Sequence, residues 1–337
     1  MPTARQAAGM KTAIDLAGQL GCTLVAMCSK WSKPEEVARL ARGAGIKLAT
    51  IETDRLPDGL LPKFETTALL AGTIFERRTD TSLKRNLGLL VARLVNWNRI
   101  VFLDDDIFIS DPDDLRAAVG LLDTHATVGM WIDGMPDNSV VCHAYRGVGG
   151  PQDTFIGGGA LAVGSAAMTS FFPNIYNEDW FFLLDDVRMR PTAITGYAKQ
   201  GPYDPFANDQ RARSEEFGDL LAEGVYWLLD HGRRVQDANA AFWKYYLGIR
   251  RQFIADVIDR AQRLDKSPKE KSRMIAALKA ASGRCQRIDP ELCVEYLRAW
   301  RTDRTRWRRH LDGLDEKAAM AMLKQARLTV IDERPDA

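Results

Sequence analysis

The chain has 337 residues, of which 46% are hydrophobic and 27% are charged. This composition is typical of a globular protein with a buried core. The formal net charge of +1 favours neither nucleic acid nor an acidic membrane surface as a partner. Any binding of phosphate groups must therefore come from a local site.

The five cysteines and the lack of long apolar stretches bear on the cellular compartment. The cysteine number is odd and no C-x-x-C spacing occurs, so a disulfide framework is not expected. Residues 1–11 lack the apolar stretch of a signal peptide. No window approaches the roughly 18 apolar residues of a membrane span. These features predict a cytoplasmic protein.

The first hundred residues alternate between helix and strand patterns. The helix of residues 82–97 has the strongest pattern, because Leu83, Leu87, Leu90 and Leu94 fall on one face. Short apolar runs predict buried strands. In chain order, the expected elements are a helix at 9–19, a strand at 24–28, a helix at 34–44, a strand at 47–51, the helix at 82–97 and a strand at 100–103.

The middle of the chain is broken by Gly and Pro, and the last part is largely helical. Strands are expected at 128–131, 140–145 and 160–163, and helices at 235–264, 268–281, 290–311 and 315–326. The basic stretch 298–310 contains two tryptophans. Its pattern favours a solvated amphipathic helix that packs these tryptophans, and a surface that binds nucleic acid or anionic lipid is the alternative. Strand–helix–strand units predict an α/β fold with a mostly parallel sheet flanked by helices, followed by a helical C-terminal extension. The predicted organisation is a catalytic region of residues 1–203 and a helical region of 204–337.

Three consecutive acids follow the strand at 100–103. Grouped carboxylates repel one another, so folding alone explains them poorly. Ligands bind at the carboxyl ends of strands in open α/β sheets. On an extended strand Asp104 and Asp106 would point to the same side and could share one Mg²⁺ or Mn²⁺ ion. Asp105 would point the other way, as a supporting group. A surface strand end is the alternative interpretation.

Several motifs in order resemble the GT-A fold glycosyltransferases, near glycosyltransferase family 2. The first is the polar segment 80–88, with the sequence Asp-Thr-Ser-Leu-Lys-Arg-Asn-Leu-Gly, which precedes an apolar helix. The second is the strand that ends in the acids. The third and fourth are Phe-Ile-Gly-Gly-Gly-Ala-Leu-Ala at 155–162 and Tyr-Asn-Glu-Asp-Trp at 176–180. The resemblance covers residues 1–190 and implies a Rossmann-like GT-A sheet, with a nucleotide-sugar half at 1–115 and an acceptor half at 116–203.

The resemblance implies roles for residues on the donor side. Asp104 and Asp106 would bind the metal, and Asp104 and Asp105 would belong to the donor site. Lys84 and Asn86 would contact the diphosphate or nucleotide, while Thr3 and Arg5 resemble the loop that lines the nucleotide. Almost nothing precedes that loop. Family members usually have an acid after the second strand that contacts the nucleotide base, and this chain has none there. Some relatives bring a histidine to the metal, and His231 is the candidate for this role.

On the acceptor side, three glycines and two acids are the candidates. Gly157, Gly158 and Gly159 would permit close approach of a sugar and tolerate positive φ, although a plain turn is the alternative. Glu178 and Asp179 could supply a general base for the acceptor hydroxyl. In inverting relatives the aspartate of such a pair does this, so Asp179 is favoured. A retaining enzyme would need no such base, and a simple helix start is the structural alternative.

These observations predict an enzyme that transfers a sugar from a UDP- or GDP-linked donor to a small-molecule or glycan acceptor, with Mg²⁺ or Mn²⁺ as cofactor. No nucleic acid or membrane span is expected, and a homodimer is possible. Two alternatives stay open: a nucleotidyltransferase, which would want a glycine-rich basic loop near the N-terminus, and a non-catalytic nucleotide-sugar-binding protein. The sugar, the base, the acceptor and the stereochemical outcome are not predicted.

Overall fold

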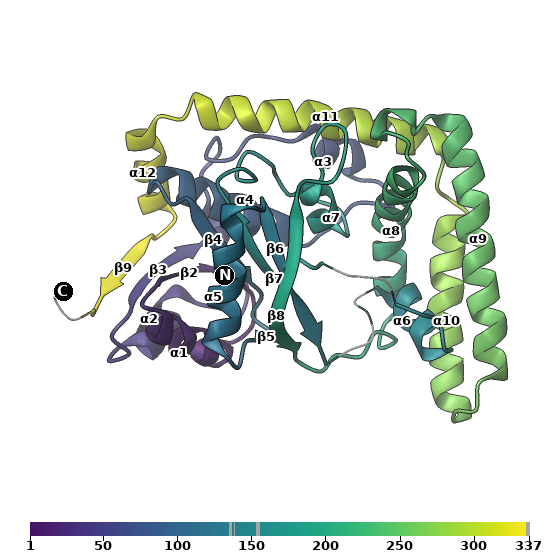
Figure 1. Ribbon diagram of the computed structural model, residues 1–337, viewed down its shortest axis with the longest axis horizontal. Helices are drawn as coiled ribbons and strands as arrows, with labels where there is room; N and C mark the ends of the chain where they lie inside the picture. The colour runs from purple at the N-terminus through teal and green to yellow at the C-terminus, as the bar shows by residue number, and fades with distance from the viewer. Residues whose placement is uncertain (135–136, 138, 153–155, 335–337) are drawn as a thin grey trace.

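Two β-sheets flanked by helices form the framework of the protein (Figure 1). The computed structural model describes residues 1–134, 137, 139–152 and 156–334. The first sheet has the strand order β1-β2-β3-β9. Its first three strands are parallel and β9 runs antiparallel to β3. The strands are β1 (Pro2–Thr3), β2 (Thr23–Cys28), β3 (Lys47–Glu52) and β9 (Thr329–Asp332).

The second sheet is mixed, with the strand order β4-β7-β6-β8-β5. Only β6 and β8 pair in parallel, while the other three pairs are antiparallel. The strands are β4 (Arg99–Leu103), β7 (Ala160–Gly164), β6 (Thr127–Asp133), β8 (Thr192–Gln200) and β5 (Ile107–Phe108). The chain is therefore of mixed α/β class. The expected single sheet is replaced by two, and the second is mainly antiparallel.

Helices cover both faces of the two sheets. Helix α4 (Thr81–Leu94) contacts β1, β2 and β4, while α1 (Lys11–Leu20) packs on β2 and against α5 (Pro112–Gly120). Alternate residues of the strands supply two separate cores. Met27 and Phe102 belong to the core on the α4 side, and Ala26 and Leu103 to the core on the α1 side. The two sheets thus share the same pair of cores.

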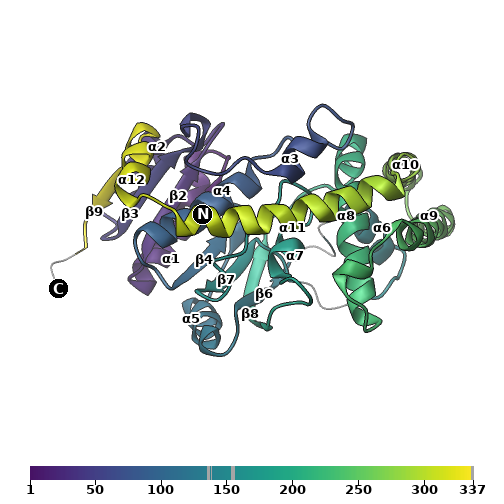
Figure 2. The same ribbon diagram turned by 90° about the horizontal axis from the view of Figure 1, so that it is seen from above.

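The C-terminal helices enclose one end of the sheets and then return along the molecule (Figures 1 and 2). Helix α11 (Pro290–Asp312) crosses from α9 (Ala240–Arg263) to α3 (Glu65–Leu70). There, Asp303 of α11 accepts hydrogen bonds from the amides of Glu65 and Thr66. The other helices of this region are α8 (Asp209–Asp230), α9 (Ala240–Arg263), α10 (Pro268–Cys285) and α12 (Glu316–Gln325). One core contains residues from both sides of position 203, so the predicted boundary is not a break in packing.

Most predicted elements are confirmed, including the strands at 24–28 and 100–103 and the helix at 82–97. The strand expected at 140–145 is wrong, because these residues form α6 (Val140–Gly147), which Ser139 caps and which packs on α10. The two tryptophans of the basic stretch, Trp300 and Trp307, are buried as predicted. The remaining elements are α2 (Pro34–Ala41), α7 (Glu178–Leu183) and the short 3₁₀ helices Ala7–Met10, Thr53–Arg55, Leu121–Asp123 and Val235–Asp237.

All five cysteines are unpaired. Among the described residues, no helix has the length and apolarity needed to cross a bilayer.

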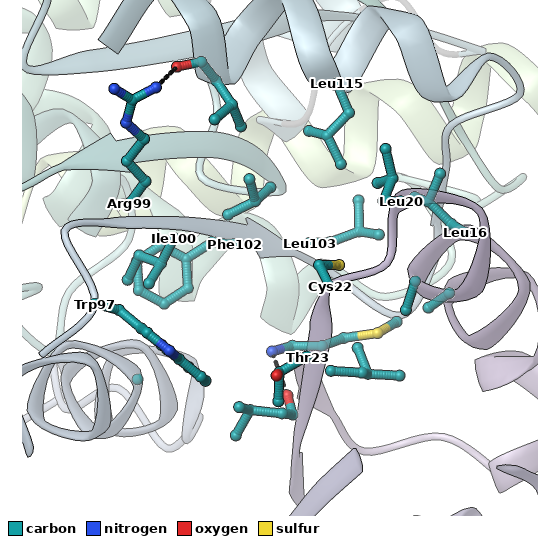
Figure 3. A pocket seen from close by; sticks show the side chains of 18 of the residues that line it. Leu16, Leu20, Cys22, Thr23, Trp97, Arg99, Ile100, Phe102, Leu103 and Leu115 are labelled. Atoms are coloured by element: carbon teal, nitrogen blue, oxygen red, sulfur yellow. Dashed lines mark hydrogen bonds between the residues drawn. The ribbon is translucent and has the colours of Figure 1, made fainter. Parts of the chain in front are cut away.

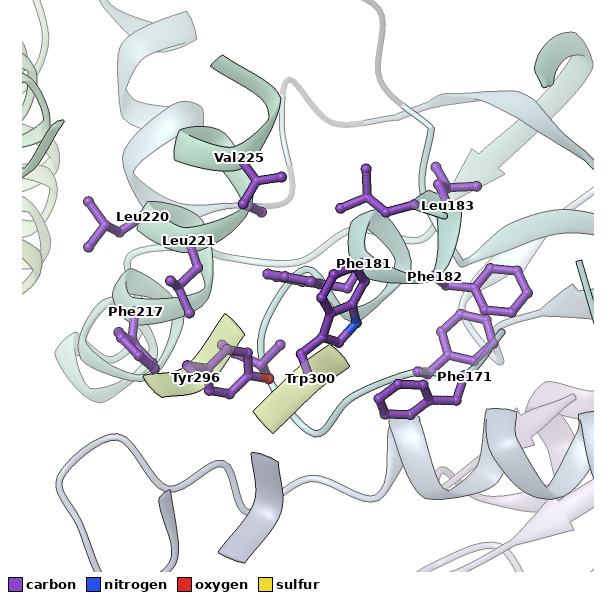
Figure 4. Packing of buried hydrophobic residues seen from close by; sticks show 14 of the residues in the cluster. Phe171, Phe181, Phe182, Leu183, Phe217, Leu220, Leu221, Val225, Tyr296 and Trp300 are labelled. Atoms are coloured by element: carbon purple, nitrogen blue, oxygen red, sulfur yellow. The ribbon is translucent and has the colours of Figure 1, made fainter. Parts of the chain in front are cut away.

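An aromatic cluster fixes the short helix α7 between α8 and α11 (Figure 4). The ring of Phe181 lies 5.5 Å from Trp300 and 6.1 Å from Tyr296, both in edge-on geometry. Such pairs add to the stabilisation that burial supplies. On the other side of α7, Phe182 stacks on Phe172 at 4.1 Å. A helix of six residues is not stable alone, so this packing holds α7 in place.

Glycine is required where α8 meets the segment before α7. A Cβ atom at Gly218 would lie 2.2 Å from the backbone oxygen of Tyr176. We expect Gly218→Ala to lower the free energy of unfolding by about 1–3 kcal/mol, because a backbone segment must move. At Gly248 in α9 a Cβ atom would have no neighbour within 4 Å, and Gly248→Ala should raise stability by up to about 1 kcal/mol through helix propensity. Urea unfolding of both variants tests this; equal effects would contradict it.

Candidate functional site

The three aspartates form a turn between β4 and β5. The amide of Ile107 donates to the carbonyl of Asp104 at 3.1 Å, which closes a turn of four residues. The expected strand alternation therefore does not apply to these acids. Each carboxylate instead finds partners on a different segment of the chain.

Asp104 forms an ion pair with Arg85 of α4. Its two carboxylate oxygens lie 2.9 and 3.1 Å from Nη2 of Arg85. The other arm of the guanidinium, Nη1, donates to Glu178 of α7 at 2.7 Å. Arg85 is only 3% exposed and Glu178 6%, so these two charges are largely removed from water, whereas the side chain of Asp104 is 28% exposed. Arg85 thus joins the aspartate turn to α7.

Burial and pairing act in opposite directions on these groups. Burial would lower the pKa of Arg85, but Asp104, Glu178 and Asp179 raise it above its ordinary value. For Asp104, burial is the largest influence and raises the pKa. Arg85 counteracts this, while the neighbouring charge of Asp106 adds to it. Asp104 is therefore a carboxylate whose negative charge is only partly compensated.

Asp105 and Asp106 bind the loop that follows β1. Oδ2 of Asp105 accepts from the backbone amides of Ala4 and Arg5 at 2.8 and 3.1 Å. Asp106 accepts from the guanidinium of Arg5 at 2.8 Å and from the side chain of Gln200 at 3.3 Å. The Arg5 side chain, which also lies 3.5 Å from Oδ1 of Asp105, is 57% exposed, so its ion pairs with the two aspartates are open to water. Asp105 supports the loop, whereas Asp106 faces an adjustable cation.

Lys84 and Thr3 support the same loop from inside. Nζ of Lys84 donates to the carbonyl of Thr3 at 2.8 Å and to Ser29 at 2.7 Å, and it pairs with Asp80 at 2.9 Å. Lys84 is 1% exposed and Thr3 2%. Both residues lie at the predicted site, but their burial and internal partners make them positioning residues. A direct contact of Lys84 with a diphosphate would require these bonds to break.

The side chain of Asn86 is bonded within the protein. Its side-chain amide donates to the carbonyl of Phe172 and accepts from the amide of the same residue, both at 2.8 Å. The side chain is 2% exposed. A contact of Asn86 with a nucleotide would require the bonds that join α4 to the segment before α7 to break.

The glycine segment lies directly against Arg85 and Asp104. The amide of Asp104 donates to the carbonyl of Gly159 at 2.9 Å. A Cβ atom at Gly158 would lie 2.5 Å from the guanidinium of Arg85. None of Gly157, Gly158 and Gly159 has positive φ, so backbone conformation does not require glycine here, while Gly158 is needed for space beside Arg85. Phe155, which begins the predicted acceptor segment, lies outside the described residues.

Asp179 closes the site on the other side of the glycines. Its carboxylate accepts from the amides of Gly158 at 2.6 Å and Trp180 at 2.9 Å. Burial, followed by repulsion from Glu178, raises the pKa of Asp179 to about 6. Asn177 has a left-handed backbone with φ of 60°, which turns the chain so that Glu178 reaches Arg85 while Asp179 reaches Gly158. The side chain of Asn177 does not cap α7 and donates instead to Asp219.

A cavity of about 360 Å³ lies beside the segment that carries Asp179. Aromatic and charged side chains line it, among them Trp180, Tyr246, Asp219, Glu223 and Arg250. Side chains of these types can stack on and hydrogen-bond to a hydroxylated molecule.

The structure does not bring His231 to the aspartates. His231 lies just after α8, where its ring stacks on Trp227 and Nδ1 lies 2.7 Å from the Trp227 carbonyl oxygen. In the described part of the chain, no three His, Cys, Asp or Glu residues form a group that could hold a metal ion. A third protein ligand from His231 is therefore not supported.

Sequence reasoning underestimated Arg85 and missed Gln200. Arg85 has no role of its own among the residues that the sequence singles out, yet it contacts residues from two of the predicted motifs. The one sequence signal was its position beside Lys84 at a helix start, where cations are unfavourable without a partner. Gln200 has no such signal, because only the pairing of β5 with β8 brings it to Asp106. Comparison of the sequence with models of known families and with curated proteins gave no match.

We expect Arg85→Met to lower the free energy of unfolding by at least about 3 kcal/mol, because Asp104 would lose its counter-charge and Glu178 would keep only the longer ion pair with Arg77, at 3.8 Å. Chemical denaturation followed by circular dichroism measures the change. Arg116 pairs with Asp113 on the surface, with both side chains more than half exposed, so Arg116→Met should change stability by less than about 1 kcal/mol. A loss at Arg85 no larger than that at Arg116 would refute this account.

Proposed function

We propose that the protein is a metal-dependent glycosyltransferase of the GT-A type, which transfers a sugar from a nucleotide-diphosphate donor to a hydroxylated acceptor. One observation carries the proposal. The aspartate turn after β4, the loop after β1, the glycine segment and Asp179 are joined through direct hydrogen bonds and ion pairs. These four segments contain most of the residues on which the family resemblance rests.

The donor atoms of the aspartate turn fit a hard divalent cation. Asp104 and Asp106 offer carboxylate oxygens, and the pKa of Asp104 is raised by burial first and also by the neighbouring charge of Asp106. Mg²⁺ is commonly held by one or two carboxylates together with the phosphates of a substrate. The lack of a three-residue ligand group among the described residues is compatible with such a shared site. Asp104 and Asp106 would hold the ion, which supplies charge stabilisation to the leaving diphosphate.

Arg5 and Arg85 would serve the donor in different ways. Arg5 is exposed and bound to Asp106, so it can turn from the carboxylate to a phosphate oxygen when the donor enters. Arg85 is fixed by Asp104 and Glu178 and would keep Asp104 oriented. Lys84 and Asp105 would hold the Thr3–Arg5 backbone in a fixed position relative to Asp104 and Asp106. Preorganised charge of this kind stabilises the charge that develops on a leaving group.

Asp179 is the proposed general base. A carboxylate with a pKa near 6 is ionised at neutral pH and still basic enough to take a proton. As the acceptor oxygen bonds to the anomeric carbon and the bond from that carbon to the diphosphate breaks, the hydroxyl proton would pass to the Asp179 carboxylate. The cavity that Trp180 and Tyr246 line would hold the acceptor. This arrangement corresponds to an inverting reaction.

Donor binding is tested by thermal shift with UDP- and GDP-sugars, each with and without Mn²⁺. A true donor should raise the melting temperature in a concentration-dependent way, and more strongly with the ion. Asp106→Asn should remove the ion-dependent part, whereas Asp123→Asn should keep it, because Asp123 is 70% exposed and pairs with Arg99 at the surface. An unchanged response in Asp106→Asn would exclude the metal assignment. Release of pyrophosphate from a nucleoside triphosphate would favour a nucleotidyltransferase, and binding without turnover a non-catalytic protein.

The pH dependence of transfer tests the role of Asp179. Since the base must be ionised, kcat/KM should fall as the pH drops through about 6. Asp179→Asn should lower the rate by about 10²–10⁴-fold and abolish this limb of the profile. The folded pKa lies above the ordinary value of 3.8, so ionisation of Asp179 opposes folding above pH 6, and the variant should not be less stable at pH 8. A pH profile that is unchanged in Asp179→Asn would rule out the proposed base.

A further inference from the structure

An apolar groove of about 570 Å³ separates the two sheets (Figure 3). It lies between β2 of the first sheet and β4 of the second, and side chains from both strands line it. Helices α1 and α5 line one face of the groove with Leu16, Leu20 and Leu115, while α4 and the loop after it line the other with Val91 and Trp97. The groove is thus walled by apolar side chains on both faces of the sheets.

Both strands beside the groove have a free edge toward it. β1 pairs with β2 only through Pro2 and Thr3, so among the described residues no strand pairs with the Thr23–Val25 part of β2 on this side. β4 is the edge strand of its sheet. The carbonyl of Val25 accepts a hydrogen bond from the nitrogen of Met1. It is unfavourable for other backbone N–H and C=O groups to face an apolar groove without a hydrogen-bond partner.

The groove has the position of one missing strand. Ala26 of β2 and Leu103 of β4 belong to the same core, and so do Met27 and Phe102 on the opposite face. The two strands therefore lie in one layer with common cores above and below. A strand placed between them would form hydrogen bonds with both β2 and β4, and each of its two faces would contact one of the two apolar cores.

The backbone of β1 leads into the groove. The amide of Met27 donates to the carbonyl of Met1, and the nitrogen of Met1 donates to the carbonyl of Val25 at 2.7 Å. In this parallel register Pro2 is opposite Met27, so Met1 is opposite Ala26. Three residues joined to the nitrogen of Met1 would then lie opposite Val25, Leu24 and Thr23. Burial lowers the pKa of the Met1 amine to about 5, whereas a peptide N–H would donate the same bond without a charge.

We propose that the groove is the docking site of one extended apolar segment, attached to the nitrogen of Met1, which completes β1 and joins the two sheets into one. Because both faces of this segment would meet apolar cores, it should be a continuous run of β-branched or aliphatic residues and not an alternating one. This inference does not depend on the proposed enzymatic activity.

The test compares two forms of the full chain that differ only before Met1. One carries five added residues rich in Val and Ile, and the other carries five Gly and Ser residues. The apolar extension should raise the melting temperature by several degrees. It should also slow amide hydrogen exchange in Thr23–Val25 and in β4 by roughly tenfold or more, as one or two added hydrogen bonds would. Ala17 is buried in α1 and lines the groove, so Ala17→Phe should cancel both gains by filling the space.

The same comparison distinguishes the other occupants. Equal melting temperatures and exchange rates for the two extensions would refute the proposal. A gain that appears only in a dimer at high protein concentration would mean that the strand enters a second copy, which also overturns it. Stabilisation of the Gly-Ser form by a fatty acid, with no gain from the apolar extension, would assign the groove to a small apolar ligand instead.

Discussion

The candidate site depends on the buried guanidinium of Arg85, which holds Asp104 with one arm and Glu178 with the other. Buried charges such as those of Arg85 and Glu178 are unfavourable unless each has a partner, so the positions of α4, the aspartate turn and α7 are coupled. Gly158 shows how tight this arrangement is, because no side chain larger than hydrogen fits beside the guanidinium. The aromatic packing around Phe181 and Phe182 then supplies the rigid support that fixes α7.

A second layer of contacts fixes the loop after β1 in the same way. Lys84 holds this loop from below, while Asp105 accepts its backbone amides. Since Lys84 and Arg85 are neighbours on α4, one helical turn positions both the loop and the aspartate. Of the three cations Arg5, Lys84 and Arg85, the last two are buried and Arg5 is exposed. The site therefore combines a rigid carboxylate framework with one adjustable cation.

The elements that the sequence predicted well are those with a local cause. The strand at 100–103 is a continuous apolar run, and α4 has a leucine face, so neither needs knowledge of distant residues. Residues 140–145 misled the prediction, because their apolar β-branched residues favour a strand while Ser139 and the contact with α10 favour a helix. β9 pairs with β3 across most of the chain, and no local pattern shows such a pairing. The same holds for the site: its acids were found, but the partners of Arg85, Asn86 and Lys84 depend on the tertiary fold.

The groove between β2 and β4 connects this local geometry to the stability of the sheets. Thr3 and Arg5, which face Lys84 and the aspartates, follow a strand that pairs through only two residues. So short a ladder constrains the loop weakly, and the bonds to Lys84 and Asp105 must supply the remaining constraint. A strand that filled the groove would extend β1 on the side away from the loop, anchor it to both sheets, and restrict the motion of the Arg5 backbone. The strand that fills the groove would then also order the loop after β1, which contacts the aspartate turn.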